Sequence, residues 1–230
     1  MLFDKTPLEE KKKRLIEELE RLGYIKSPSV KRAMMAVPRE LFVLEKYRKN
    51  AYDDIPLPIL ANQTISAPHM VAMMTELLSL KPGHKVLEVG TGSGYQAAIC
   101  AEIVAPKGSP VRGHVYSIER IRELVEFARN NLKRAGYLDR VTVIHGDGSL
   151  GLPSEAPFDR IVVTAAAPQI PPPLVEQLND RDGVLVIPVG SAYSFQELKV
   201  LVKRNGRMEV KGFGFCVFVP LIGKYGVSSF

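Results

Sequence analysis

The 230-residue chain has little cysteine and no cluster of metal-binding residues. Its two cysteines, Cys100 and Cys216, lie far apart in apolar stretches, and neither belongs to a CxxC pair or to a cysteine–histidine pattern with metal-ligand spacing. Free cysteines in such surroundings are usually part of the hydrophobic core. We therefore expect two buried thiols and no bound metal.

Long apolar runs are also absent. The most apolar stretches, residues 183–189 and 213–222, are much shorter than the ~20 residues that a membrane span requires. The N-terminus passes directly into a charged helical pattern, without the apolar core and cleavage site of a signal peptide. We expect a cytoplasmic protein that does not associate with membranes.

Charge of one sign dominates only at the N-terminus. Residues 1–50 carry thirteen Lys and Arg against eight Asp and Glu, whereas the remainder carries eighteen against seventeen. A basic excess can indicate nucleic-acid binding, but the lysines at 11–13 alternate with glutamates at helical spacing. Such a pattern is typical of a solvated, salt-bridged helix face, so we expect no nucleic-acid partner.

The first 68 residues predict a helical extension followed by an active-site lining segment. Thr6 begins a helix as the N-cap of a capping box, and Gly23 ends it. Ser27 begins a second helix, which must stop before Pro38. The proline-rich segment 51–68 has little periodicity, so we expect an extended, ordered lid that lies on another part of the protein.

Residues 69–230 predict an α/β core. The expected strands, which are short β-branched runs, are 86–89, 115–118, 141–144, 161–163 and 184–187. The expected helices are 69–80, 95–104, 121–135 and 172–178. Two further strands, 198–202 and 208–210, flank Asn205-Gly206, which is a strong hairpin signal. We predict a doubly wound, mostly parallel sheet with an antiparallel C-terminal hairpin, in a single compact domain with the extension.

A glycine-rich turn follows the first strand and leads into a helix. It reads Glu88-Val89-Gly90-Thr91-Gly92-Ser93-Gly94. A dinucleotide site would read GxGxxG, but here the third glycine comes one residue early. The pattern resembles the first motif of S-adenosylmethionine (AdoMet) dependent methyltransferases, which have a Rossmann-like fold. The resemblance implies that Glu88, Gly90, Thr91, Gly92 and Gly94 bind AdoMet; the alternative is a tight turn that requires positive φ.

Acidic residues follow the next two strands. Glu119 ends the second strand, where its carboxylate can accept hydrogen bonds from both ribose hydroxyls of a cofactor. Asp147, followed by Gly148, comes after the third strand and resembles the residue that accepts a hydrogen bond from the adenine amino group in this superfamily. We expect all three residues to bind AdoMet. For Asp147 the alternative is an Asx turn, which is common in Asp-Gly sequences.

The region before the glycine-rich turn carries a more specific resemblance. Segments 51–59 (AYDDIPLPI) and 63–70 (QTISAPHM) strongly resemble protein-L-isoaspartate (D-aspartate) O-methyltransferases. The similarity continues through residues 37–43, 86–98, 158–168 and 183–190, so it covers most of the chain.

The family resemblance implies roles for the Thr-Ile-Ser segment. Thr64, Ile65 and Ser66 would line the substrate site, with Ser66 as the catalytic residue. A plain helix N-cap is the alternative role for Ser66. His69 is as compatible with a structural role as with substrate contact, and we assign no ligand contacts after Val219.

The implied reaction is methyl transfer from AdoMet to the free carboxylate of isoaspartyl residues, leaving S-adenosylhomocysteine. A carboxylate with a pKa near ~4 is already ionised at neutral pH and requires no general base. The sequence accordingly has no Ser/His/Asp constellation, and it has no Arg or Lys between residues 56 and 80 that would hold the carboxylate too firmly. The expected partners are isoaspartyl peptides and unfolded proteins, methylated by a monomer.

Three other functions are compatible with parts of the pattern. An AdoMet-dependent RNA methyltransferase would use the basic N-terminus, but Thr164-Ala165-Ala166-Ala167-Pro168 lacks the Asn/Asp-Pro-Pro-aromatic motif of enzymes that methylate base amino groups. A non-catalytic isoaspartyl-binding adaptor would have lost the glycines or acidic residues that are present here. A nicotinamide dehydrogenase is disfavoured by the glycine spacing.

Overall fold

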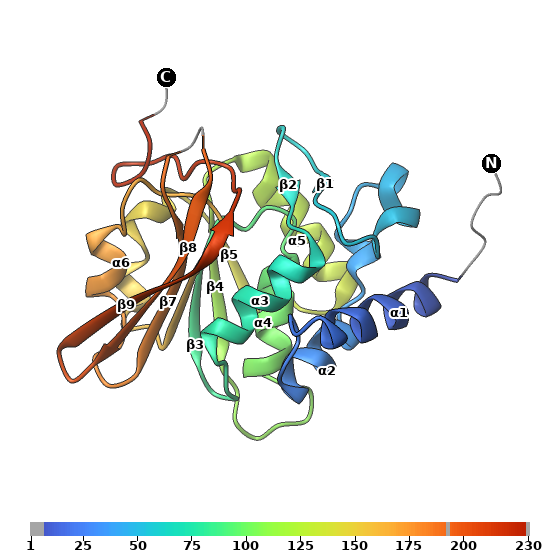
Figure 1. Ribbon diagram of the computed structural model, residues 1–230, viewed down its shortest axis with the longest axis horizontal. Helices are drawn as coiled ribbons and strands as arrows, with labels where there is room; N and C mark the ends of the chain where they lie inside the picture. Colours follow the sequence, from blue (N-terminus) through green and yellow to red (C-terminus); the bar gives the residue numbers. More distant parts are fainter. Residues whose placement is uncertain (1–6, 192–193, 229–230) are drawn as a thin grey trace.

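A seven-stranded sheet forms the centre of the protein (Figure 1). The computed structural model describes residues 7–191 and 194–228. The strands lie in the order β5-β4-β3-β6-β7-β8-β9, with the first five parallel and the last two antiparallel. They are β3 (Lys85–Val89), β4 (His114–Glu119), β5 (Val141–His145), β6 (Arg160–Val163), β7 (Gly183–Val189), β8 (Gln196–Arg204) and β9 (Arg207–Cys216). This confirms the predicted doubly wound sheet with an antiparallel C-terminal hairpin.

Helices cover both faces of the sheet. One face packs against α3 (Pro68–Leu78), α4 (Tyr95–Val104) and α5 (Arg122–Ala135). The other packs against α6 (Pro172–Glu176) and the short 3₁₀ turns η3 (Gly148–Leu150) and η4 (Pro153–Glu155). Every residue of β6 is buried. Burial on both faces explains why the central strands are continuous apolar runs rather than alternating ones.

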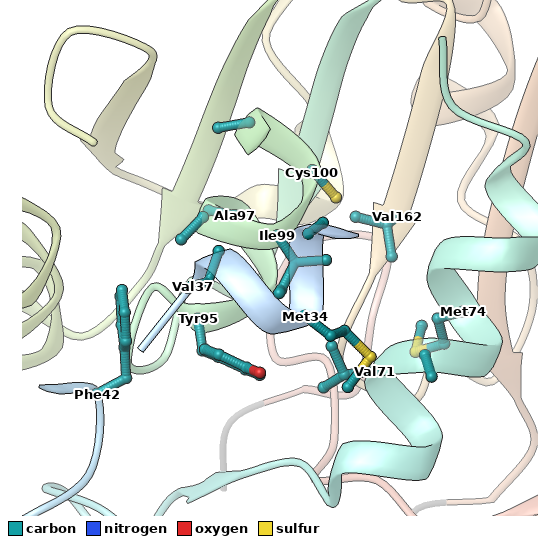
Figure 2. Close-up of a cluster of buried hydrophobic side chains, with 14 of the residues drawn as sticks. Met34, Val37, Phe42, Val71, Met74, Tyr95, Ala97, Ile99, Cys100 and Val162 are labelled. Atoms are coloured by element: carbon teal, nitrogen blue, oxygen red, sulfur yellow. The ribbon is translucent and has the colours of Figure 1, made fainter. Parts of the chain in front are cut away.

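The N-terminal extension packs on the same side as α3 and α4 (Figure 1). It contains α1 (Leu8–Arg21), α2 (Pro28–Ala36), η1 (Arg39–Leu41), η2 (Glu45–Asn50) and a small hairpin of β1 (Leu57–Pro58) and β2 (Thr64–Ile65). Figure 2 shows Met34 and Val37 packed among side chains of α3 and α4. One hydrophobic cluster therefore runs from the extension into the sheet, which supports our proposal that the extension (residues 1–68) and the α/β core (residues 69–230) form a single domain.

Local sequence signals placed several boundaries correctly. The Ser27 hydroxyl accepts a hydrogen bond from the Val30 N–H, and α2 ends before Pro38. Asn205 and Gly206 have φ of 49° and 75° and join β8 to β9. The predicted cap Thr6 lies outside the described residues.

Two further expectations concern residues 7–191 and 194–228, the part of the chain that the structure describes. No helix in these ranges is long and apolar enough to cross a membrane. Cys100 and Cys216 are buried free thiols, as predicted.

Candidate active site

The chain reverses its strand order at the centre of the sheet. β3 pairs with β4 on one side and with β6 on the other, so the loops that leave these strands diverge at their carboxyl ends. A cleft with an empty volume of about 840 Å³, including its opening to solvent, lies at this point. Its position is typical of a small-molecule site in an open α/β sheet.

The glycine-rich turn lines the floor of the cleft. Gly90, Gly92 and Gly94 have φ of +96°, +54° and +87°, so all three adopt a backbone conformation that favours glycine. A Cβ atom at Gly90 would lie 2.5 Å from the Thr164 hydroxyl oxygen. Gly94 differs, because a Cβ there would lie 3.2 Å from Leu132 Cγ, and this glycine packs against α5 instead of lining the cleft.

Glu119 holds the glycine-rich turn while lining the cleft. It is 7% exposed, and its carboxylate accepts hydrogen bonds from the Gly92 N–H at 3.0 Å and the Ile121 N–H at 2.9 Å. A carboxylate has about four acceptor positions, so two remain for ligand hydroxyls.

Glu88 is fully buried and also lines the cleft. One carboxyl oxygen accepts a hydrogen bond from the Ser117 hydroxyl, which lies 2.6 Å from the Thr91 hydroxyl. The other oxygen, Oε1, has no partner among the described residues. Burial raises the pKa of Glu88 to about 8, and the neighbouring Glu119 adds to the increase. A cationic donor from a ligand would satisfy this orphan acceptor and favour its ionised form.

Asp147 faces away from the cleft. Its carboxylate accepts hydrogen bonds from the N–H and hydroxyl of Ser149 and from the Lys224 N–H, at 2.7–2.9 Å. Burial alone raises the pKa of Asp147, but these hydrogen bonds bring it below its ordinary value. The Asx-turn geometry expected as the alternative is present, and only Gly148 of this pair lines the cleft. Asp147 instead lines an adjacent cavity with Ile118, Ile144 and Tyr225.

The lid segment contributes residues to the wall of the cleft. Thr64, Ile65 and Ser66 all line it; Thr64 is exposed, Ser66 half-buried and Ile65 buried. The Ser66 hydroxyl makes no hydrogen bond to another described residue. Its suggested role as helix N-cap is wrong, because Ala67 occupies that position of α3.

His69 has a structural partner on the lid. The Asp54 carboxylate accepts a hydrogen bond from the His69 N–H at 2.9 Å and lies 3.0 Å from the ring nitrogen Nδ1. Asp54 therefore supplies the acceptor that α3 lacks at its own N-terminus. His69 does not line the cleft.

Several residues that line the cleft were not predicted from the sequence. Backbone pairing of Ala166 with Pro220 brings the C-terminal stretch against the end of β6, a contact with no local sequence signal. The missed lining residues include Gln96, Arg120, Ile121, Leu124, Thr164, Ala165, Val219, Pro220, Leu221 and Ile222.

A cofactor such as AdoMet fits these residues. The orphan Oε1 of Glu88, the close backbone at Gly90 and Gly92, and the spare acceptor positions of Glu119 all face one cleft. A solved Plasmodium falciparum structure, titled as a putative protein-L-isoaspartate O-methyltransferase in complex with S-adenosyl-L-homocysteine, is 33% identical with a TM-score of 0.80, covering 91% of this chain and 97% of that one. The fold and the cleft define an AdoMet-dependent methyltransferase.

A family model identifies the chain more closely. The model for protein-L-isoaspartate(D-aspartate) O-methyltransferase matches residues 10–226. The chain therefore belongs to the protein-L-isoaspartate (D-aspartate) O-methyltransferase family. It is 61% identical to the protein-L-isoaspartate O-methyltransferase of Hyperthermus butylicus, over 97% of this chain and 93% of that one, and 56% identical to that of Pyrococcus horikoshii, over 98% and 99%.

The raised pKa of Glu88 predicts that AdoMet binding depends on pH. A buried carboxyl with a pKa of about 8 is mostly protonated at pH 6, and it would have to lose this proton if it holds a cationic group of the cofactor, as we propose. Affinity should therefore rise with pH between 6 and 8, by up to about tenfold per unit. Calorimetric titration should show this rise, with proton release, in the wild type and a much flatter profile in Glu88→Gln. Equal slopes in the two proteins would contradict the assignment.

Proposed function

We propose that this protein transfers a methyl group from AdoMet to the free carboxylate of L-isoaspartyl residues in damaged proteins. The main support for the proposal is that two sets of residues line one cleft. The first set is the glycine-rich turn with Glu88 and Glu119, and the second is the Thr64–Ser66 segment. Family membership supports the substrate class.

Bound AdoMet supplies a methyl group on a positively charged sulfur. The residues of the chain then have two tasks: to orient an anionic acceptor and to exclude water. A negative carboxylate and a positive sulfonium neutralise each other in the transition state, so a water-poor cleft favours the reaction. Buried Ile65 and Val71 and the C-terminal residues 219–222 line the cleft and limit the access of water.

The Thr64 and Ser66 hydroxyls are proposed to orient the substrate carboxylate. Both residues line the cleft, and the Ser66 hydroxyl has no other described partner. Neutral donors hold an anion less tightly than a bidentate arginine does, so they leave more of its nucleophilicity for the transition state. The cleft also contains no Ser/His/Asp constellation among its lining residues, in keeping with a nucleophile that is already ionised.

The following backbone amide nitrogen is expected to attack the carbonyl of the methyl ester and release methanol, which forms a succinimide without further help from the enzyme. Hydrolysis of the succinimide returns part of the material to normal aspartate, so repeated cycles repair the chain. The substrate must be a flexible or unfolded segment, because the cleft has to admit a kinked backbone. Monomeric action is also part of the proposal.

A time course by liquid chromatography and mass spectrometry tests this function, because the isoaspartyl and aspartyl peptides have the same mass and must be separated by chromatography. A purified isoaspartyl peptide incubated with the enzyme and AdoMet should pass through a methyl ester and a succinimide, and the aspartyl peptide should accumulate. Peptide without AdoMet serves as the control. If AdoMet binds but the peptide remains unmodified, the proposed substrate is wrong, and RNA should be tested as the methyl acceptor.

A further inference from the structure

One fully buried arginine connects the lid to the cofactor loop. Arg39, in the turn η1, is 0% exposed. Its Nε donates a hydrogen bond to the Ala51 carbonyl at 2.8 Å, and its Nη2 donates one to the Ser66 carbonyl, also at 2.8 Å. The centre of its guanidinium group lies 4.9 Å from the centre of the Tyr95 ring. A single side chain thus contacts three segments that are distant in sequence.

The hydrogen bonds of Arg39 lie near both ends of the lid segment. Ala51 and Ser66 stand near the two ends of the lid segment, and the neighbouring Glu40 accepts a hydrogen bond from Tyr52. Tyr95 directly follows Gly94, lines the cleft and packs edge-on against Phe42 (Figure 2). The position of the Ser66 backbone relative to the glycine-rich turn is therefore fixed through the guanidinium of Arg39.

We propose that Arg39 is a positioning residue for methyl transfer, which holds the Ser66 backbone in register with the glycine-rich turn. This inference rests on the proposed function of the Thr64–Ser66 segment. Arg39 does not line the cleft, so it acts through Ser66 and not on the substrate. A displacement of about 1 Å in a substrate-orienting group can lower the rate ~10²-fold.

The chemistry of arginine suits this task. Its planar fork presents separate N–H groups to two carbonyls while its charged centre lies over an aromatic ring, which the single ammonium of lysine cannot reproduce. The third nitrogen, Nη1, is buried without a partner among the described residues. A buried charge with an unsatisfied donor is costly, so it is weak evidence for a purely stabilising role.

Arg160 provides a matched control. It is 2% exposed, and it too donates hydrogen bonds to backbone carbonyls, those of Leu78, Asp159 and Asp182, at 2.6–2.7 Å. These acceptors lie away from the cleft, and Arg160 does not line it. Substitutions at both positions remove a buried guanidinium, but only those at Arg39 change the support of Ser66.

The test compares Arg39→Lys and Arg39→Met with Arg160→Lys and Arg160→Met, assayed below the melting temperature of each variant. We expect the Arg39 variants to lose about tenfold or more in kcat/KM for an isoaspartyl peptide, with AdoMet Kd within about threefold of the wild type. The Arg160 variants should stay within about twofold in kcat/KM while melting at lower temperature. If Arg39→Met does not fold, Arg39→Lys is compared with Arg160→Lys alone.

A double variant separates positioning from general destabilisation. If Arg39 acts through Ser66, Arg39→Lys combined with Ser66→Ala should be no slower than Ser66→Ala alone. If the loss of kcat/KM in the double variant equals the product of the two single losses, Arg39 does not act through Ser66 and the proposed role is wrong. It is also wrong if the Arg39 variants behave like the Arg160 variants. A wild-type protein that does not methylate isoaspartyl peptides overturns the proposed function instead, and the positioning role with it.

Discussion

Replacing Gly90 by alanine should lower the affinity for AdoMet by about 30-fold or more, a loss of ~2 kcal/mol. The backbone at Gly90 has φ of +96°, and a Cβ atom would lie 2.5 Å from the Thr164 hydroxyl oxygen. That hydroxyl cannot easily move, because its single proton is shared between the carbonyls of Gly90 and Val89, which lie 2.5 and 3.1 Å away. Backbone strain and overpacking each cost about 1–3 kcal/mol, so the loop is expected to shift out of its ligand-binding position.

Gly136→Ala is the control for the Gly90 substitution. Gly136 has φ of +79°, close to that of Gly90, but a Cβ there would meet nothing within 4 Å. It caps the C-terminus of α5 and does not line the cleft. Calorimetric titration should show nearly wild-type AdoMet affinity in Gly136→Ala despite reduced stability. Equal losses of affinity in both variants would mean that strain alone explains the effect and that the cleft is not the cofactor site.

Replacing Ser66 by alanine should lower kcat/KM for isoaspartyl peptides by about 10- to 100-fold while leaving AdoMet affinity unchanged. A hydrogen bond to a charged group contributes ~1.5–3 kcal/mol, and each 1.4 kcal/mol corresponds to about tenfold in rate. The Ser66 hydroxyl has no described partner within the protein, so its loss should not disturb the fold.

Ser109→Ala provides the comparison for Ser66. The Ser109 hydroxyl donates to the Val111 carbonyl in the exposed loop between α4 and β4, away from the cleft. Steady-state kinetics with a synthetic isoaspartyl peptide should show wild-type values for this variant. If Ser66→Ala also retained full activity, Ser66 would have to be removed from the catalytic assignment.

The sequence predicts the sheet well where burial is uniform. The run Ile161–Val163 predicts β6, but the strand also includes Arg160, a charged residue whose burial depends on carbonyls from other parts of the chain. β9 extends to Cys216, well beyond the predicted 208–210, because its glycines and exposed side chains weaken the strand pattern. Its register also shifts between Glu197 and Lys199 of β8, a bulge that no local pattern indicates.

In the cleft, too, local motifs predict some of the residues, whereas contacts between distant segments of the chain determine the others. Motifs predicted that Gly90, Gly92, Glu119 and Ser66 would meet, and the structure brings them to one cleft. The direction of the Asp147 side chain depends on the Lys224 N–H, which is 77 residues away in the sequence. Contacts of this kind follow from how the C-terminal stretch folds back, and periodicity or spacing does not encode them.

Methyl transfer from labelled AdoMet to paired synthetic peptides tests the central claim most directly. The two peptides share one sequence and differ only in containing L-isoaspartate or normal L-aspartate at a single position. We predict label in the isoaspartyl peptide, released by mild base as expected for an ester, and none above background in the aspartyl peptide. Equal labelling of both peptides, or AdoMet binding without transfer to either, would contradict the proposed function.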